Sequence, residues 1–99
     1  ILIKTSTDSI DIANSISSTV LNQKLAPCTQ IYKTESKYIW NKKITKSYEY
    51  IVEIKTITKY KNKVSNIIKE IHNYDIPEII SLNMNILNED YKEWFNENI

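Results

Sequence analysis

The chemistry that this chain could perform centres on its single histidine, His72. Glu78 lies on the other side of a short segment that ends in Pro77, so an imidazole and a carboxylate could approach each other. They would offer nitrogen and oxygen donors to a divalent metal ion, with the single cysteine, Cys28, as a soft candidate ligand from elsewhere. One histidine and one glutamate are too few for a closed structural site, and a histidine at a helix end can instead cap carbonyl groups. Metal contact and helix capping therefore both stay open for His72.

The segment around His72 is predicted to switch from helix to strand. The residues before it recur at i, i+3, i+4 and i+7, which is one apolar face of a helix: Val64, Ile67, Ile68 and Ile71. Pro77 disfavours the α conformation at the preceding residue, Ile76, so we expect the helix to end before Pro77. Beyond Pro77 the period changes to two, and the apolar positions are expected to face a core: Ile80, Leu82, Met84 and Ile86.

The first part of the chain predicts a strand and a helix. Residues 1–3 are apolar and extended, and residues 5–8 supply candidate caps for the helix that follows. The helix has a regular apolar stripe and ends before Pro27. The members of the stripe are Ile12, Ala13, Ile16, Val20 and Leu21.

Two extended segments, 29–40 and 44–56, come next and are predicted to form a hairpin. The turn between them lacks glycine, so Asn41 is expected to take a positive φ. Thr58 is a candidate cap for the second helix, and Asn88 for a third. The order is βαββαβ with an added C-terminal helix. This predicts a single α+β domain over residues 1–99, a ferredoxin-like antiparallel sheet with two helices on one face.

Composition argues against several classes of partner. Thirteen basic and twelve acidic residues give a net charge of +1, and the absence of a basic cluster argues against nucleic acid or an acidic membrane as the main partner. No apolar run approaches the roughly 18 residues of a membrane span, so we expect no direct membrane insertion. A single cysteine excludes an internal disulfide, and Cys28 is expected to be a small buried thiol.

Two other functional classes share the expected order of elements. An RNA-recognition motif would need aromatic side chains on both central strands, but residues 1–4 carry none, and Ser47 and Glu49 replace the small residues that admit bases. An acylphosphatase-like enzyme would need an arginine and a glycine-containing loop, and the chain has neither residue type. No catalytic pairing replaces them, so we expect no enzymatic activity.

The run His-x-Tyr-x-x-Pro-Glu, formed by His72, Tyr74, Pro77 and Glu78, resembles the signature of the CutA family of divalent-cation tolerance proteins. The resemblance continues over nearly the whole chain. It includes Leu25 to Cys28, Tyr38, Trp40, Tyr48, Glu49, Lys55, Thr56, Tyr91 and Trp94. The chain departs from the family in two places: the hairpin turn lacks the usual glycine, and Lys4 stands where several bacterial relatives carry a cysteine.

The resemblance implies a homotrimer without enzymatic activity that binds copper or another divalent metal ion weakly through His72 and Glu78. The resemblance implies no required cofactor. An alternative that it implies is a signalling or anchoring module, similar to the trimeric nitrogen-regulatory proteins, with a small ligand between subunits near Lys55 and Tyr74. A membrane-protein partner is open in either case. We expect a cytoplasmic protein, although the chain begins without Met, so a preceding targeting segment is left open.

Self-association is also expected from the hairpin itself. Strands of about 12 residues span roughly 40 Å, whereas a domain of this size has a radius of gyration of about 13 Å. The far end would therefore overrun the core and expose apolar side chains on open strand edges. Closed cyclic assembly would cover them, and the resemblance selects threefold closure. The expected interface residues are Tyr38, Trp40 and Ile44, with Ile39 beside them.

Overall fold

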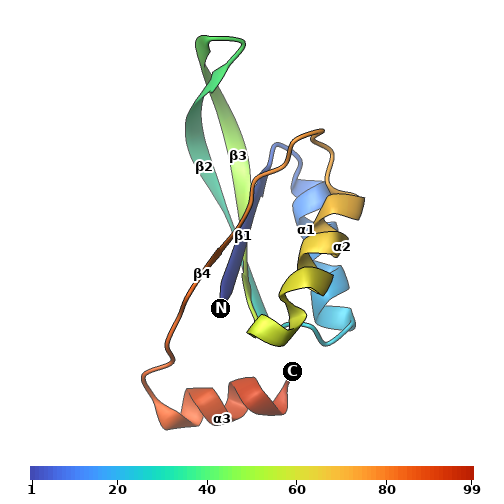
Figure 1. The fold of residues 1–99 in the computed structure, drawn as a ribbon, viewed down its shortest axis with the longest axis vertical. Helices are drawn as coiled ribbons and strands as arrows, with labels where there is room; N and C mark the ends of the chain where they lie inside the picture. The colour runs from blue at the N-terminus through green and yellow to red at the C-terminus, as the bar shows by residue number, and fades with distance from the viewer.

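The computed structural model describes all 99 residues as an α+β fold with one four-stranded antiparallel sheet. The sheet order is β2-β3-β1-β4, which is the ferredoxin-like arrangement predicted (Figure 1). The elements in chain order are β1 (Leu2–Thr7), α1 (Ile10–Asn22), β2 (Cys28–Trp40), β3 (Lys43–Lys55), the short 3-10 helix η1 (Thr58–Tyr60), α2 (Lys61–Ile71), β4 (Ile79–Leu82) and α3 (Glu89–Glu97).

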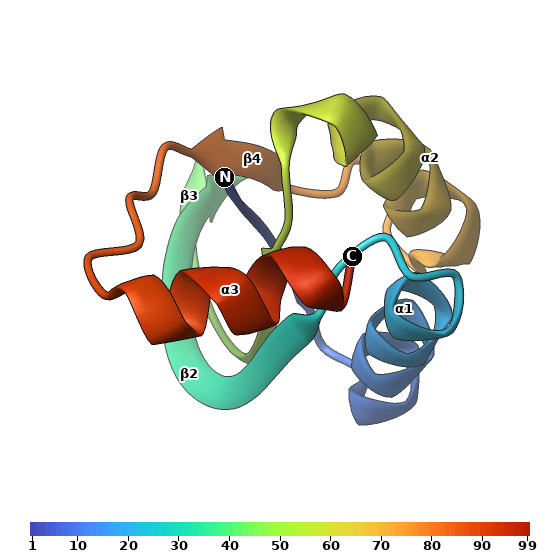
Figure 2. The ribbon, with the colours of Figure 1, turned by 90° about the horizontal axis from the view of Figure 1, so that it is seen from below.

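Helices α1 and α2 lie together on one face of the sheet (Figure 2). Their apolar stripes and the inward residues of β1 and β3 form the core, because alternate strand positions point to the helices. The predicted stripes are confirmed at their central positions, although Leu21 is exposed. The buried core comprises Ile3, Ala13, Ile16, Val20, Leu25, Ala26, Val52, Ile54, Val64 and Ile68.

The caps of the first two helices differ from those predicted. Ser9, not a residue of the segment 5–8, caps α1, and its Oγ accepts the backbone N–H of Ile12 at 3.2 Å. Residues 5–7 are instead part of β1, which runs further than the predicted strand. Thr58 begins η1, and α2 starts at Lys61 without a side-chain cap. Cap residues were misplaced because several small polar side chains in sequence can each accept such a bond.

The β2–β3 hairpin is paired from Cys28 opposite Lys55 to Trp40 opposite Lys43. Its two-residue turn has φ of 50° at Asn41 and 62° at Lys42, so the predicted positive φ at Asn41 is confirmed and Lys42 shares it. Two positive-φ residues form the primed turn whose twist matches that of paired strands.

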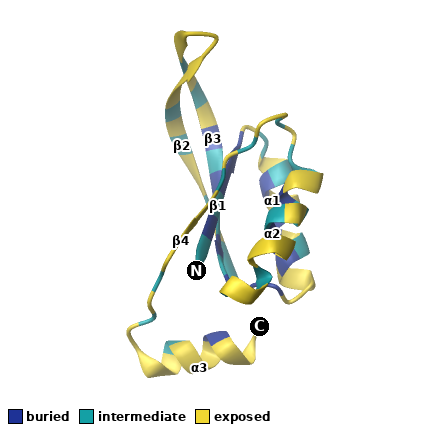
Figure 3. Cartoon of the chain, in the orientation of Figure 1, coloured by how far each residue is buried: buried dark blue, intermediate teal, exposed yellow.

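The hairpin extends well beyond the sheet, as predicted. Strand β1 pairs with β3 only from Tyr50 to Lys55, so the outer half of the hairpin has no third strand. This half projects from the molecule and is largely exposed (Figure 3). The longest dimension is 46 Å although the radius of gyration is only 14.3 Å.

Strand β4 is shorter than predicted, and the residues expected to face the core point to the other side of the sheet. The strand ends at Leu82, so Met84 and Ile86 lie outside it. Ile79 packs against the core, whereas Ile80 and Leu82 are 42% and 48% exposed on the sheet face that α1 and α2 leave open. The expectation that Ile80 and Leu82 face the core was therefore wrong: they pair with Lys4 and Leu2 of β1, whose neighbour Ile3 faces inward.

The third helix, α3, crosses the end of the molecule and buries Phe95 (Figure 2). Asn88 is its N-cap residue by position, but its side chain donates to Asp90 instead of accepting a backbone N–H. None of the three α-helices combines the length and apolarity needed to cross a bilayer.

Candidate functional site

His72 ends α2 and uses both ring nitrogens in hydrogen bonds. Nδ1 accepts the backbone N–H of Tyr74 at 3.0 Å, so in the neutral ring the proton resides on Nε2. Nε2 then donates to the carbonyl oxygen of Ser6 at 2.8 Å. The backbone N–H of His72 also closes the helix by donating to the Ile68 carbonyl at 2.8 Å. The imidazole thus ties the end of α2 to the end of β1.

Glu78 binds the same residue of β1. Its Oε2 accepts the Ser6 hydroxyl at 3.0 Å. His72 and Glu78 therefore both contact Ser6: His72 bonds its main-chain carbonyl, and Glu78 bonds its side chain. Between them, Asn73 accepts the Thr7 hydroxyl and donates to Asp8, both at 2.7 Å. These contacts fix the segment between α2 and β4.

Tyr74 reaches across the open face of the sheet to β3. Its hydroxyl donates to Oε2 of Glu49 at 2.8 Å, and only 6% of Glu49 is exposed. Burial, the hydrogen bond to Glu49 and the negative charge of Glu49 raise the pKa of Tyr74 well above its usual value. The His72 and Tyr74 rings lie 4.9 Å apart. Glu49 was not among the predicted site residues, and only its place in the family resemblance could have indicated it.

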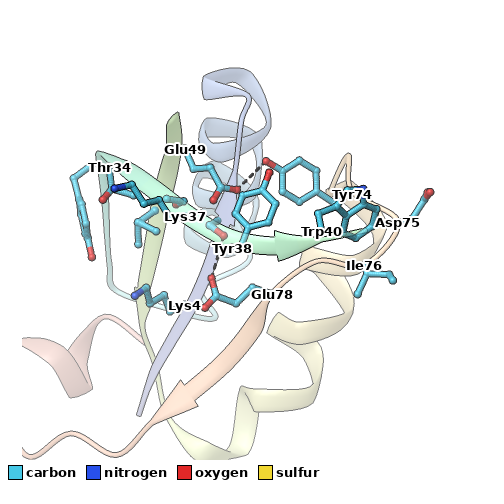
Figure 4. A pocket seen from close by; sticks show the side chains of 14 residues that line it. Lys4, Thr34, Lys37, Tyr38, Trp40, Glu49, Tyr74, Asp75, Ile76 and Glu78 are labelled. Atoms are coloured by element: carbon cyan, nitrogen blue, oxygen red, sulfur yellow. Dashed lines mark hydrogen bonds between the residues drawn. The ribbon is translucent and has the colours of Figure 1, made fainter. Parts of the chain in front are cut away.

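A cavity of about 790 Å³ opens beside Tyr74 and Glu49 (Figure 4). Glu49, Tyr74 and Glu78 line one part, and the aromatic rings of Tyr38 and Trp40 line another. Two lysines, Lys4 and Lys37, also line it, so carboxylates, ammonium groups and aromatic rings share one cavity on the open sheet face. The other lining residues are Ser6, Tyr32, Thr34, Ser36, Ile51, Asp75 and Ile76.

His72, Lys55 and Ile44, three of the predicted site residues, do not line this cavity. Lys55 ends β3, and its ammonium lies 5.9 Å from the centre of the Tyr91 ring of α3, so one chain does not bring Lys55 and Tyr74 into one cavity. Ile44 pairs with Ile39, so it points to the hairpin face opposite Tyr38 and Trp40.

Cys28 is half-buried at the start of β2 instead of fully buried. No three side chains of histidine, cysteine, aspartate or glutamate gather closely enough to hold a metal ion. Within one chain, His72 and Glu78 are an incomplete donor set.

Comparison with known proteins gives a consistent assignment. Residues 1–98 match the family model described as CutA1 divalent ion tolerance protein. The chain belongs to the CutA1 family. A CutA1 family member from Pyrococcus horikoshii, named divalent-cation tolerance protein CutA, is 30% identical over 97 residues, which cover 98% of this chain and 95% of the relative.

Solved CutA structures share the fold of this family member over almost its full length. The crystal structure of CutA1 from Pyrococcus horikoshii aligns with a TM-score of 0.90 at 28% identity, covering 98% of this chain and 95% of the other. The CutA of Archaeoglobus fulgidus, described as a periplasmic divalent cation tolerance protein, aligns with a TM-score of 0.91 at 26% identity and the same coverage.

Proposed function

We propose that this CutA1 family member is a homotrimer without enzymatic activity that binds divalent metal ions, copper among them, weakly at His72 and Glu78. The observation that carries the proposal is that both side chains contact Ser6, which lines the cavity on the open sheet face. They supply one imidazole and one carboxylate, a donor pair suited to divalent transition metals. Water or a neighbouring subunit would complete the coordination. We also propose a cytoplasmic location.

The hydrogen bonds of His72 explain why binding would be weak. A metal ion on Nδ1 would displace the N–H of Tyr74, and one on Nε2 would displace the proton donated to Ser6. Each displacement leaves a backbone group without its partner, which costs about 1–3 kcal/mol when the group is buried. The loss of this hydrogen bond would offset part of the free energy of metal coordination.

The uncovered sheet face supports the trimer. Ile80 and Leu82 of β4 are half-exposed there, and Tyr38 and Trp40 extend the same apolar surface along the hairpin. The edges of β2 and β4 are also unpaired in one chain. A cyclic assembly would bury this face and pair these edges, which single domains otherwise protect by other means.

Calorimetric titration with Cu²⁺ and Zn²⁺ tests the metal site. We expect weak binding that is reduced in Glu78→Gln and in His72→Gln, whose amide can keep part of the hydrogen bonding. Glu93→Gln, an exposed glutamate on α3, is the matched control and should titrate as the unmodified chain does. Isotherms that do not change in either site variant would remove His72 and Glu78 from the ligand set.

Light scattering tests the trimer. Trp40→Asp should produce monomers, because it places a charge on the proposed interface. Ile44→Asp makes the same change at the third expected interface residue, on the other face of the hairpin, and should also weaken the trimer. A folded, unmodified monomer at micromolar concentration would contradict the proposal. A variant Ile44→Asp that stays trimeric would confine the interface to the hairpin face of Tyr38 and Trp40.

A small ligand between subunits is the second candidate function, and the cavity favours it. Tyr74, Trp40 and two lysines, Lys4 and Lys37, line a volume in the range of small-molecule sites. In this signalling or anchoring role, Lys55 would have to come from a neighbouring subunit, because it lies outside the cavity of its own chain. Chemical shifts of Tyr74 on addition of candidate anions, compared with those of a Lys4→Gln variant, would separate this role from metal binding.

A further inference from the structure

Lys4 is the one lysine of strand β1, and it belongs to the open face of the sheet. Its neighbours Ile3 and Thr5 are buried, and alternate residues of a strand point to opposite faces. Lys4 lines the cavity together with Glu78, one of the two proposed metal ligands (Figure 4). A cation that is part of the protein therefore shares a cavity with the proposed site of a divalent cation.

Three carboxylates share this sheet face with Lys4. Glu53 of β3 is directly opposite Lys4 in the β1–β3 register, and residues opposite each other point to the same face. Glu78 accepts the hydroxyl of Ser6, which lies two residues along β1 from Lys4 and on the same face. Glu49 is buried in the wall of the same cavity. Lys4 is therefore placed among the groups that would attract a metal ion.

Lys4 has no fixed ion-pair partner among these carboxylates. The one ion pair of the chain lies on the hairpin. The nearby carboxylates accept hydroxyl groups instead: Glu53 accepts that of Tyr32 at 2.8 Å, and Glu78 accepts that of Ser6 at 3.0 Å. A lysine ammonium is a compact charge on a flexible stem, so it can move among several acceptors. The ammonium group of Lys4 therefore acts on the cavity through its charge and not through one rigid contact.

Lys37, the other lysine of the cavity, has different surroundings. It belongs to the outer half of the hairpin, it is exposed, and the residue opposite it in the hairpin register is Lys46. No carboxylate is opposite Lys37, whereas Glu53 is opposite Lys4. The two lysines have the same charge and line the same cavity, so Lys37 is a matched comparison for the effect of Lys4.

We propose that Lys4 is a resident cation that competes with divalent metal ions at Glu78 and so sets the metal affinity of the cavity. The inference rests on the metal binding proposed above. Without metal, the ammonium group balances part of the carboxylate charge; a divalent ion that enters is repelled by it. Even in a high dielectric, this repulsion at a separation of several ångströms corresponds to about a five- to tenfold loss of affinity. The sequence did not indicate this role, because Lys4 and Glu78 lie near opposite ends of the chain.

Calorimetric titration of the full chain with Zn²⁺ and with Cu²⁺ tests the proposal. Lys4→Met removes the charge and keeps an unbranched apolar stem, so it should bind about five- to tenfold more tightly than the unmodified chain. Lys4→Arg keeps the charge and should bind as the unmodified chain does. Lys37→Met has the same net charge as Lys4→Met and should change the affinity less than about twofold. The gain in Lys4→Met should shrink in salt, because the Debye length falls from about 10 Å at 0.1 M to about 3 Å at 1 M.

A double variant connects the gain to Glu78. Lys4→Met combined with Glu78→Gln should lose the gain, because the repulsion acts on a metal ion that Glu78 holds. Circular dichroism and light scattering check that each variant is folded and assembled as the unmodified chain is, and Lys4→Gln replaces Lys4→Met if the latter is not.

The possible outcomes separate this inference from the proposed function. The inference is overturned if Lys4→Met binds no more tightly than the unmodified chain, or if Lys37→Met gains as much. If His72→Gln weakens binding while Lys4→Met gains nothing, the metal site stands and only the role of Lys4 is rejected. Absence of metal binding in the unmodified chain and in every variant would reject both.

Discussion

The hydroxyl of Tyr74 donates a 2.8 Å hydrogen bond to the carboxylate of Glu49, which joins the segment after α2 to the middle of β3. Because His72 binds Ser6 of β1 and Glu78 binds it too, this segment is attached to both central strands. Polar contacts therefore help to hold the cavity wall near the proposed metal ligands. Removal of any one contact should affect the position of the others.

Spectrophotometric titration should detect the Tyr74–Glu49 pair. The raised pKa of Tyr74 predicts that it ionises later than an ordinary tyrosine, and that Tyr74→Phe reduces this late component. Tyr32, whose pKa is also raised by its hydrogen bond to Glu53, should account for the part that remains. Glu49→Gln keeps a hydrogen-bond acceptor but removes the negative charge, so Tyr74 should ionise at lower pH than in the unmodified chain. An unchanged late component in Tyr74→Phe would show that another tyrosine is responsible.

The same pair should make stability depend on alkaline pH. The pKa of Tyr74 is raised in the folded state above its ordinary value near 10.0. Protonated Tyr74 therefore contributes to the free energy of unfolding wherever the residue is protonated in both the folded and the unfolded state. This contribution is complete below pH 10 and is lost as pH rises above it, because the unfolded chain ionises first. Since Tyr74 is partly solvated, we expect a loss below about 1 kcal/mol per pH unit. In urea titrations at increasing pH, Tyr74→Phe should lack this part of the decline; parallel declines would contradict the assignment.

The substitution Lys42→Gly should stabilise the hairpin turn. The positive φ of 62° is costly for a residue with a Cβ, and glycine adopts it freely. The gain should be about 0.5–1 kcal/mol after the extra flexibility of the unfolded chain is counted. Lys43→Gly, within β3, is the matched control and should destabilise. Thermal unfolding measures both, and destabilisation by Lys42→Gly would argue against the primed turn.

Pro77→Ala should be tolerated in folding. Pro77 lies before β4, outside the strand, and α2 already ends at Ile71, so the proline is not what stops the helix. The substitution should loosen the link between α2 and β4 and cost less than about 3 kcal/mol in denaturant unfolding. A larger cost would place Pro77 in a more constrained role than its position indicates.

Much of the fold followed from local patterns in the sequence. The apolar spacing that includes Val64 and Ile68 determined the buried side of α2, because both residues lie on one face of any regular helix. Two long β-rich segments around Asn41 likewise determined the hairpin and its turn. These features depend on residues within a few positions of one another, so no knowledge of distant contacts was needed.

The tertiary structure decided which side of each strand meets the core and which distant residues meet one another. Alternation divides β4 into two faces, but only its register with β1 turns Ile79 inward and Ile80 outward. The contact of Tyr74 with Glu49 joins residues 25 positions apart, and the pairing of β1 with β3 places Lys4 beside a glutamate of the open sheet face. These outcomes depend on the register between strands that lie far apart in the sequence. A shift of one residue in that register would turn every side chain of a strand to the opposite face of the sheet.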